Sequence, residues 1–313
     1  MMNSKFRLES LPNELIIELF KYFNTQDLFR MFYNLNYRFN YLIQSLMHLS
    51  YSTDEHEYQS YPYIRTLIIK STMIDQLHSF PNVRRLMLNY LTDDLISQLN
   101  ANILPNLEYL SIDHKVHPYY MSDLRNKVFS NTFPYLKSCY ISRMSLLQSS
   151  TQTYSLRCLK LNDIDSSIYL SILLTCPNLY SLKFKLSVKS KIQSNIITHI
   201  NLKRLIINMN SDYWPWDDHI LVNYLLCVPN LEQFRISRSI GRDTTSMNYL
   251  QDYDWLYSIV TSHLFLLNQF RFDLYLNQSC RLIANDFGQL CCNLNRRFFS
   301  VYNYRYNSRL RIF

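Results

Sequence analysis

Between Pro12 and Phe23 the chain carries more apolar residues than one helix face can hold. Polar side chains occur only at Asn13, Glu14, Glu18 and Lys21. A surface helix needs one apolar stripe about 100° wide to pack on its own domain. The surplus of apolar residues therefore predicts that this helix packs against a second surface in addition to its own domain.

Two further helical patterns follow this first helix. One contains Leu28, Phe29, Met31, Phe32 and Leu35, and Asn24-Thr25 before it supplies residue types that cap helix N-termini. The other begins near Tyr37 and continues to Met47. Residues 8–48 are thus predicted to form three short helices, a unit of about 40 residues that is rarely stable alone. We expect it to pack on the rest of the chain, on a partner, or on both.

From residue 61 onward one phrase recurs, Pro-x-Leu-x-x-Leu-x-Leu with substitutions. The first apolar positions of its copies are Ile64, Val83, Leu107, Leu136, Leu156, Leu179, Leu202, Leu231 and Leu267. Successive copies are 19 to 36 residues apart, mostly within or near the range of leucine-rich repeats, roughly 20–29 residues. The L-x-L alternation predicts short strands with one buried face, and helical runs such as 94–99, 168–174 and 220–226 separate them.

Strand-then-helix units of this kind stack into a curved solenoid with a parallel sheet on its concave side. The predicted fold class is therefore α/β, with three N-terminal helices followed by an irregular repeat solenoid. The expected parts are the helices in 1–48, a polar linker in 49–60, the solenoid in 61–292 and a basic aromatic cap in 293–313, interpreted as a closing strand pair. The alternative is an α/β domain that is not a solenoid.

Two motifs resemble those of a known family. The pattern Leu8-x-x-Leu11-Pro12-x-Glu14-Leu15-Ile16-x-x-Leu19-Phe20, then Asp27-Leu28-x-Arg30 and Arg38-Phe39-x-x-Leu42, resembles an F-box over about 40 residues. Cys176-Pro177-Asn178-Leu179 is similar to the repeats of F-box proteins with leucine-rich repeats. The third helix departs from the pattern, because Leu35 to Phe39 stand where many F-boxes carry Val-Cys and a Trp.

The resemblance implies docking onto the Skp-type adaptor of a Skp–cullin–F-box (SCF) ubiquitin ligase, and through it onto a cullin scaffold. The adaptor-binding residues that it implies are Leu11, Pro12, Glu14, Ile16, Leu19, Phe20 and Leu28. An ordinary helical cap on the following domain is the alternative interpretation of these helices.

Composition narrows the chemistry of this 313-residue chain, of which 48% is hydrophobic. Two glycines exclude glycine-rich phosphate loops and dinucleotide-binding fingerprints. Seven cysteines without a Cys-x-x-Cys pair argue against a disulfide framework and a structural zinc site. No apolar run approaches the roughly 20 residues that cross a bilayer, and Met1 to Arg7 lacks a signal core. We therefore expect a cytoplasmic or nuclear protein without a membrane partner, catalytic residues, metal or cofactor.

The net charge of +8 is unevenly placed. Strand residues that flank the buried positions face the concave side of a solenoid. The basic residues at these positions are Lys70, Arg85, Lys160, Lys183, Lys185, Arg204, Arg235 and Arg271, and the acidic ones are Asp113 and Asp273. The segment 293–313 adds five arginines and no acidic residue. A positive concave wall predicts binding of acidic or phosphorylated segments.

Three insertions follow strands, at 113–123, 209–219 and 237–254, and the second carries Trp214 and Trp216, residue types that anchor interfaces. The predicted target-binding set is Arg85, Lys160, Lys183, Lys185, Arg204, Arg235, Arg271, Trp214 and Trp216. The predicted function is a non-catalytic, substrate-recognition subunit of an SCF-type ligase. The alternatives are a leucine-rich-repeat scaffold outside any ligase and, with less support, a nucleic-acid binder that uses the basic face and tail.

Overall fold

The computed structural model describes residues 8–46, 50–53, 64–70, 77–112, 121–143, 151–186, 197–209, 218–240, 254–276, 287–302 and 305–312. The chain divides into two compact units, Met1–Tyr120 and Met121–Phe313. This division falls inside the predicted solenoid and not at the predicted linker, so that the N-terminal helices and the first strands share one unit.

The first unit begins with a short 3-10 turn, η1 (Leu8–Ser10), and three helices, α1 (Asn13–Phe20), α2 (Thr25–Phe32) and α3 (Tyr37–Ser45). The predicted cap is confirmed, because the Asn24 side chain accepts the backbone N–H of Asp27 at 2.8 Å. Asn36 caps α3 in the same way. The helices meet around Phe20, whose ring centroid lies 5.1 Å from that of Phe32 and 6.3 Å from that of Phe39.

Arg38 ties the start of this unit to its third helix. Its Nε donates to Asn13 Oδ1 at 2.7 Å, one terminal nitrogen donates to the carbonyl oxygen of Leu11 at 2.5 Å, and the other donates to that of Glu9. Because charge-assisted bonds are the stronger ones, these contacts hold the segment before α1 against α3.

Four parallel strands follow in the first unit, β1 (Ser50–Thr53), β2 (Thr66–Ile69), β3 (Arg85–Leu88) and β4 (Tyr109–Ile112), with η2 (Leu77–Ser79) and α4 (Asp93–Gln98) between them. Leu67, Leu86 and Leu110 are in register and fully buried. The sequence-based assignment of residues 50–53 to a linker is wrong. Ser50 to Thr53 lacks aliphatic alternation, and its backbone pairs with β2 instead.

The second unit continues the strand-and-helix pattern. Its parallel strands are β5 (Ser138–Arg143), β6 (Cys158–Ile164), β7 (Ser181–Leu186), β8 (Arg204–Met209), β9 (Gln233–Ile240), β10 (Gln269–Leu276) and β11 (Arg309–Ile312). Its helices are α5 (Met121–Phe129), α6 (Ser166–Thr175), α7 (Asp218–Leu226), α9 (Asp254–His263) and α11 (Phe287–Tyr302). All nine strands predicted from the repeated phrase are present across the two units.

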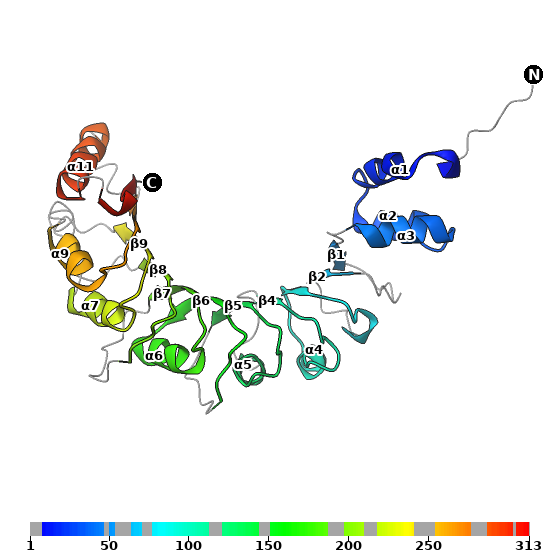
Figure 1. The fold of residues 1–313 in the computed structure, drawn as a ribbon, viewed down its shortest axis with the longest axis horizontal. Coiled ribbons are helices and arrows are strands. Elements are labelled where there is room, and N and C mark those ends of the chain that lie inside the picture. The colour runs from blue at the N-terminus through cyan, green and yellow to red at the C-terminus, as the bar shows by residue number, and fades with distance from the viewer. Residues whose placement is uncertain are drawn as a thin grey trace, which may run out of the picture. The chain divides into compact units, whose positions relative to one another are not determined.

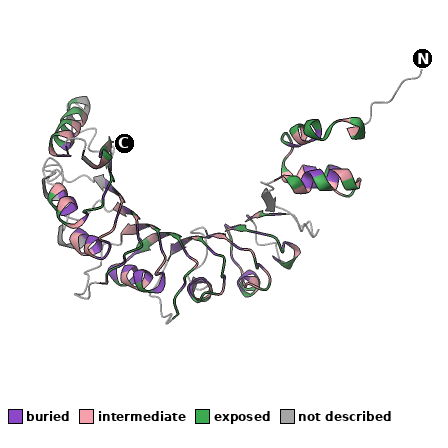
Figure 2. Cartoon of the chain, in the orientation of Figure 1, coloured by how far each residue is buried: buried purple, intermediate pink, exposed green. Residues whose placement is uncertain are grey.

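The helices of the second unit cover one face of its sheet (Figure 1). Phe184 of β7 packs against Tyr169 of α6 and Tyr224 of α7, with ring centroids 5.6 and 5.7 Å apart. The ring centroid of Phe270 of β10 lies 5.0 Å from that of Tyr302 of α11. Buried residues alternate with more exposed ones along β6 and β7, and Figure 2 colours the strands by this burial. The side chains that alternate with the buried ones form what we call the open face.

The turns that enter the strands explain the Pro-Asn-Leu phrase. The side-chain amides of Asn178, Asn201 and Asn230 donate to backbone carbonyls of the preceding repeat, at 3.0, 2.9 and 3.2 Å. His199 serves the same turns from within the core, since its Nδ1 accepts the Leu202 N–H at 3.1 Å and its Nε2 lies 2.9 Å from the Cys176 oxygen. These bonds link consecutive repeats.

The C-terminal cap differs from the predicted strand pair. Helix α11 contains Leu294, Phe298 and Tyr302 at a spacing of four residues, and all three side chains are buried. After the turn η4 (Arg305–Asn307), the single strand β11 pairs in parallel with β10. The predicted boundary at 292/293 falls inside α11, because the four-residue apolar spacing favours a helix there.

Candidate binding surface

A row of basic side chains crosses the open face of the second unit. The register aligns Tyr140, Lys160, Lys183, Ile206, Arg235, Arg271 and Arg309 on seven neighbouring strands. We call Lys160, Lys183, Arg235, Arg271 and Arg309 the basic row. Adjacent strands are about 4.8 Å apart, so these cations form a positive band that only Ile206 of β8 interrupts.

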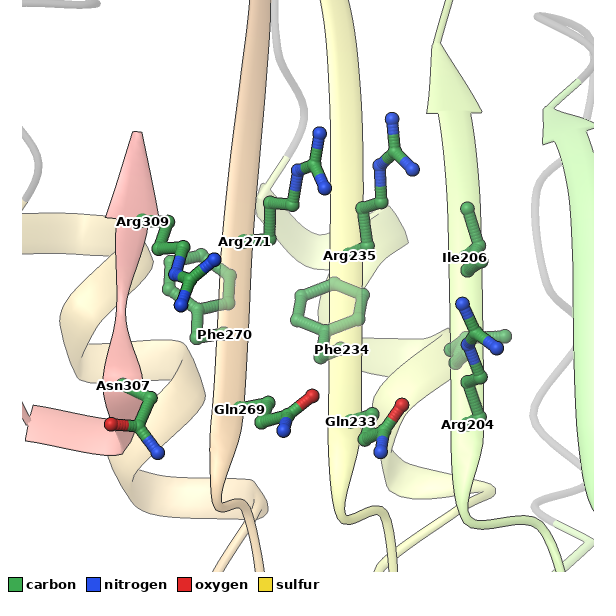
Figure 3. Close-up of a pocket in the computed structure, with 11 residues that line it drawn as sticks. Arg204, Ile206, Gln233, Phe234, Arg235, Gln269, Phe270, Arg271, Asn307 and Arg309 are labelled. Carbon is green, nitrogen blue, oxygen red and sulfur yellow. The ribbon is translucent and has the colours of Figure 1, made fainter. Parts of the chain in front are cut away.

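A second row lies beside the first, with Arg204, Gln233 and Gln269 in register on β8, β9 and β10. The second row and three members of the basic row, Arg235, Arg271 and Arg309, line a depression of about 330 Å³ at the β8–β11 end of the sheet. Figure 3 shows its polar side chains, which are Arg204, Gln233, Arg235, Gln269, Arg271, Asn307 and Arg309. The sequence prediction treated the basic face and the basic tail as separate features, but Arg309 of the tail extends the row.

Asp273 lies below this surface and not on it. Its side chain is fully buried, and the Nε atoms of Arg235 and Arg271 both donate to its carboxylate, the second at 2.8 Å. The Ser237 hydroxyl lies 3.5 Å from the same carboxylate. Asp273, predicted as an acidic member of the face, therefore acts as a shared anchor for two of its arginines.

The positive charges of the row affect one another. The pKa of Lys183 is lowered, first by partial burial and then by repulsion from Lys160, Arg235 and Arg204. A like charge nearby disfavours the charged form of a lysine. The three cations that repel Lys183 lie on the same face as it does, and a cluster of this kind favours an anionic ligand.

Other predicted residues of the face differ in their surroundings. Lys185 pairs with Asp163 at 3.3 Å, and Lys160 lies 4.0 Å from the centre of the Tyr140 ring. In the first unit, Lys70 is exposed, and Arg85 stacks over Tyr109 at 4.5 Å. Asp113, Trp214 and Trp216 lie outside the described residues. The predicted third insertion starts later, since 237–240 belong to β9.

The predicted adaptor-binding residues separate into two groups. Ile16, Phe20 and Leu28 are buried in the core of the three helices. Leu11 and Leu19 are half-buried, whereas Pro12 and Glu14 are exposed. The first group thus stabilises the unit from within, and only the second offers a surface.

Leu15 adds an apolar residue to this surface, with 52% of its area exposed. It lies one helical turn from Leu19 and three residues after Pro12, so the three share one side of α1. Leu15 belongs to the F-box-like pattern but not to the adaptor-binding residues that the resemblance implies.

The described residues contain no group of three or more His, Cys, Asp or Glu side chains placed to hold a metal ion. Burial raises the pKa of Cys176 to about 12, and it raises the pKa of Cys139 further. Both thiols therefore stay protonated near neutral pH and pack as apolar groups.

Within the described ranges, no helix combines the length and the apolar character needed to cross a membrane.

No protein-family model matches this chain, and no curated protein is significantly similar to it.

Proposed function

We propose that this protein is a substrate receptor of an SCF-type ubiquitin ligase. Helices α1–α3 dock a Skp-type adaptor, which links the chain to a cullin scaffold, and the open face of the second unit holds an acidic or phosphorylated segment of a target protein. The chain itself makes and breaks no bond. It contributes by holding the target close to the ligase, which raises its effective concentration.

The observation that carries the proposal is the basic row. On strands β5–β11 the carboxylates are Asp163 and Asp273. The first pairs with Lys185 and the second is buried beneath two arginines. The row therefore presents cations across adjacent strands with little internal compensation, which favours an extended anionic ligand.

The helices support the other half of the proposal. Their resemblance to an F-box rests on the Leu-Pro-x-Glu opening and the following Asp-Leu, and the structured helices coincide with that stretch. Exposed apolar side chains remain in this segment, with Leu15 on α1 and Tyr22 and Leu35 in the turns between the helices. These exposed side chains support the proposal, because a docked partner would cover them.

Two alternatives remain distinct from this proposal. A repeat scaffold outside any ligase uses the open face without an adaptor. A nucleic-acid binder uses the same cations, and Arg309 strengthens that alternative because it joins the tail to the row. Among the described residues of this open face, only Tyr140 and Tyr275 have aromatic rings on which a base could stack. This small number disfavours the nucleic-acid alternative.

Adaptor docking is tested by the double variant Pro12→Ser with Leu15→Glu. Both positions are exposed, so the fold is expected to persist while a charge enters the apolar contact. We expect at least about a tenfold loss in affinity for a purified Skp-type adaptor, or about 1.4 kcal/mol, measured by co-purification and titration. The matched control is Tyr154→Glu, which places the same charge at an exposed apolar side chain of the second unit. Unchanged adaptor binding by the double variant rules out docking through α1 and leaves the scaffold alternative.

A further inference from the structure

The depression between β8 and β11 gathers more arginines than any single carboxylate ligand needs. Arg204, Arg235, Arg271 and Arg309 come from four neighbouring strands. Figure 3 shows them on one side of the sheet, beside the amides of Gln233, Gln269 and Asn307. With the buried carboxylate of Asp273, the four guanidinium groups leave a formal charge of +3.

The contacts of Asp273 determine which arginine atoms remain available. Arg235 and Arg271 both use Nε toward this carboxylate. A guanidinium has five N–H donors, so each keeps its terminal N–H groups for another acceptor. Among the described residues, neither these terminal groups nor the guanidiniums of Arg204 and Arg309 have a hydrogen-bond partner. The carboxylate of Asp273 thus holds the guanidinium groups of Arg235 and Arg271 side by side. Their terminal N–H groups, which bond no described residue, are available to a ligand.

This arrangement matches a phosphate monoester better than a carboxylate. A phosphate monoester carries a charge of about −1.5 to −2 and three strong acceptor oxygens, whereas a carboxylate has two oxygens and one charge. Two neighbouring forks bond three oxygens with bidentate geometry. A dianion also neutralises most of the local charge of +3.

The amide row suits the chain that carries such a group. Gln233, Gln269 and Asn307 both donate and accept, as the main chain of an extended segment requires. Asn307 sits in the left-handed region with φ of 43°, a conformation that asparagine tolerates. From β8 to β11 the span is about 14 Å, the length of about four extended residues.

We propose that the depression binds a phosphate monoester on an extended segment of the target protein, and that Asp273 is a positioning residue that aligns Arg235 and Arg271 for it. This inference rests on the proposed function of the open face, and it names the ligand chemistry there. Asp273 acts only through the two arginines and does not contact the ligand.

The variant Asp273→Asn keeps the size of the side chain and removes its charge. It tests the positioning role because Coulomb attraction alone and positioning predict opposite changes in the affinity for the phosphate. Coulomb attraction alone predicts tighter binding of every anion, since one negative charge is lost. Positioning predicts weaker binding of the phosphate. Arg235 and Arg271 donate to different oxygens of Asp273, and Asn replaces one of these oxygens with an NH2 group, so that one guanidinium loses its acceptor. The probes are a blocked peptide Ala-Ala-pSer-Ala-Ala, the same peptide with Glu for pSer, and a single-stranded oligothymidylate, titrated against the full chain by fluorescence anisotropy.

For the unmodified chain we expect the phosphopeptide to bind about tenfold more tightly than the Glu peptide. Asp273→Asn is expected to weaken phosphopeptide binding about fivefold while oligothymidylate binding stays the same or tightens. The double variant Arg235→Lys with Arg271→Lys keeps both charges and both partners of Asp273 but lacks the forks. It is expected to lose the preference for phosphate, and it carries the test if Asp273→Asn fails to fold.

The possible outcomes distinguish failure of the phosphate site from failure of the proposed function. Phosphopeptide binding that is unchanged or tighter in the folded variants overturns the positioning role. Equal affinity for the phosphopeptide and the Glu peptide overturns the phosphate site but leaves the proposed anionic target in place. Binding of neither peptide, or much tighter binding of oligothymidylate than of both, contradicts the inference and the proposed function together.

Discussion

Replacing Arg235 and Arg271 together by methionine is expected to lower the unfolding free energy of the second unit by about 3–5 kcal/mol. The change leaves the buried carboxylate of Asp273 with the Ser237 hydroxyl, at 3.5 Å, as its one remaining hydrogen-bond donor among the described side chains. A buried charge without a cationic partner is costly, and methionine retains much of the packing of an arginine stem. Urea denaturation followed by circular dichroism measures the loss.

The third substitution, Asp273→Asn, is expected to restore most of the stability lost in the double variant. Neutralising the buried group removes the charge that the arginines had compensated. The matched control is Arg204→Met with Arg309→Met, which removes two guanidiniums of the same depression that have no carboxylate partner among the described residues. The control should change stability by less than about 1 kcal/mol. An equal loss in the control, or no recovery with Asp273→Asn, contradicts the assigned role of the carboxylate.

Phe20→Ala is expected to destabilise the three N-terminal helices by about 3–5 kcal/mol. The ring is 1% exposed and contacts the rings of Phe32 and Phe39. Truncation leaves a cavity at the point where α1, α2 and α3 meet. Hydrogen exchange of the backbone amides in 13–45 should accelerate strongly in this variant.

Leu15→Ala is the matched control, because it shortens an exposed side chain of the same helix. We expect it to change stability by no more than about 0.5 kcal/mol. Slow exchange in the Phe20→Ala variant, equal to that of the control, contradicts the assignment of Phe20 to the core. Loss of adaptor binding in Phe20→Ala alone reports unfolding, and for this reason the docking test uses exposed positions.

The repeated strands were predictable because their apolar alternation is strong. Leu159 and Leu161 of β6, for example, mark a buried face that the structure confirms. Strand β1 has no such alternation, and it forms through backbone pairing with β2. The final helix was missed because its apolar residues recur every four positions among many polar and aromatic ones.

The sequence predicted on which side of the sheet the basic residues lie, but not which charged side chains of that side are buried. The two-residue period of a strand places Lys183, Arg235 and Arg271 on one side of the sheet. The same period cannot distinguish an exposed Asp273 from a buried one that holds two arginines. Arg309 was missed in the row because its register depends on the pairing of β11 with β10.

The adaptor-binding prediction met a similar limit. The F-box resemblance selects positions along α1, but it does not show which of them the neighbouring helices cover. Ile16 and Phe20 face the core because α2 and α3 pack there, while Leu15 stays exposed. Both motif and packing are needed to choose the residues for an interface test.

The central claim is that the open face of the second unit is an anion-binding surface. Its most direct test is the affinity of the full chain for a labelled hexaglutamate peptide, measured by fluorescence anisotropy at increasing KCl concentrations. We expect binding that weakens with salt as the charges are screened, and a loss of about tenfold in the variant Lys160→Gln with Lys183→Gln. The control Lys137→Gln with Arg296→Gln removes two charges outside the row and should stay within about twofold. Binding that ignores salt, or an equal loss in both variants, contradicts the account.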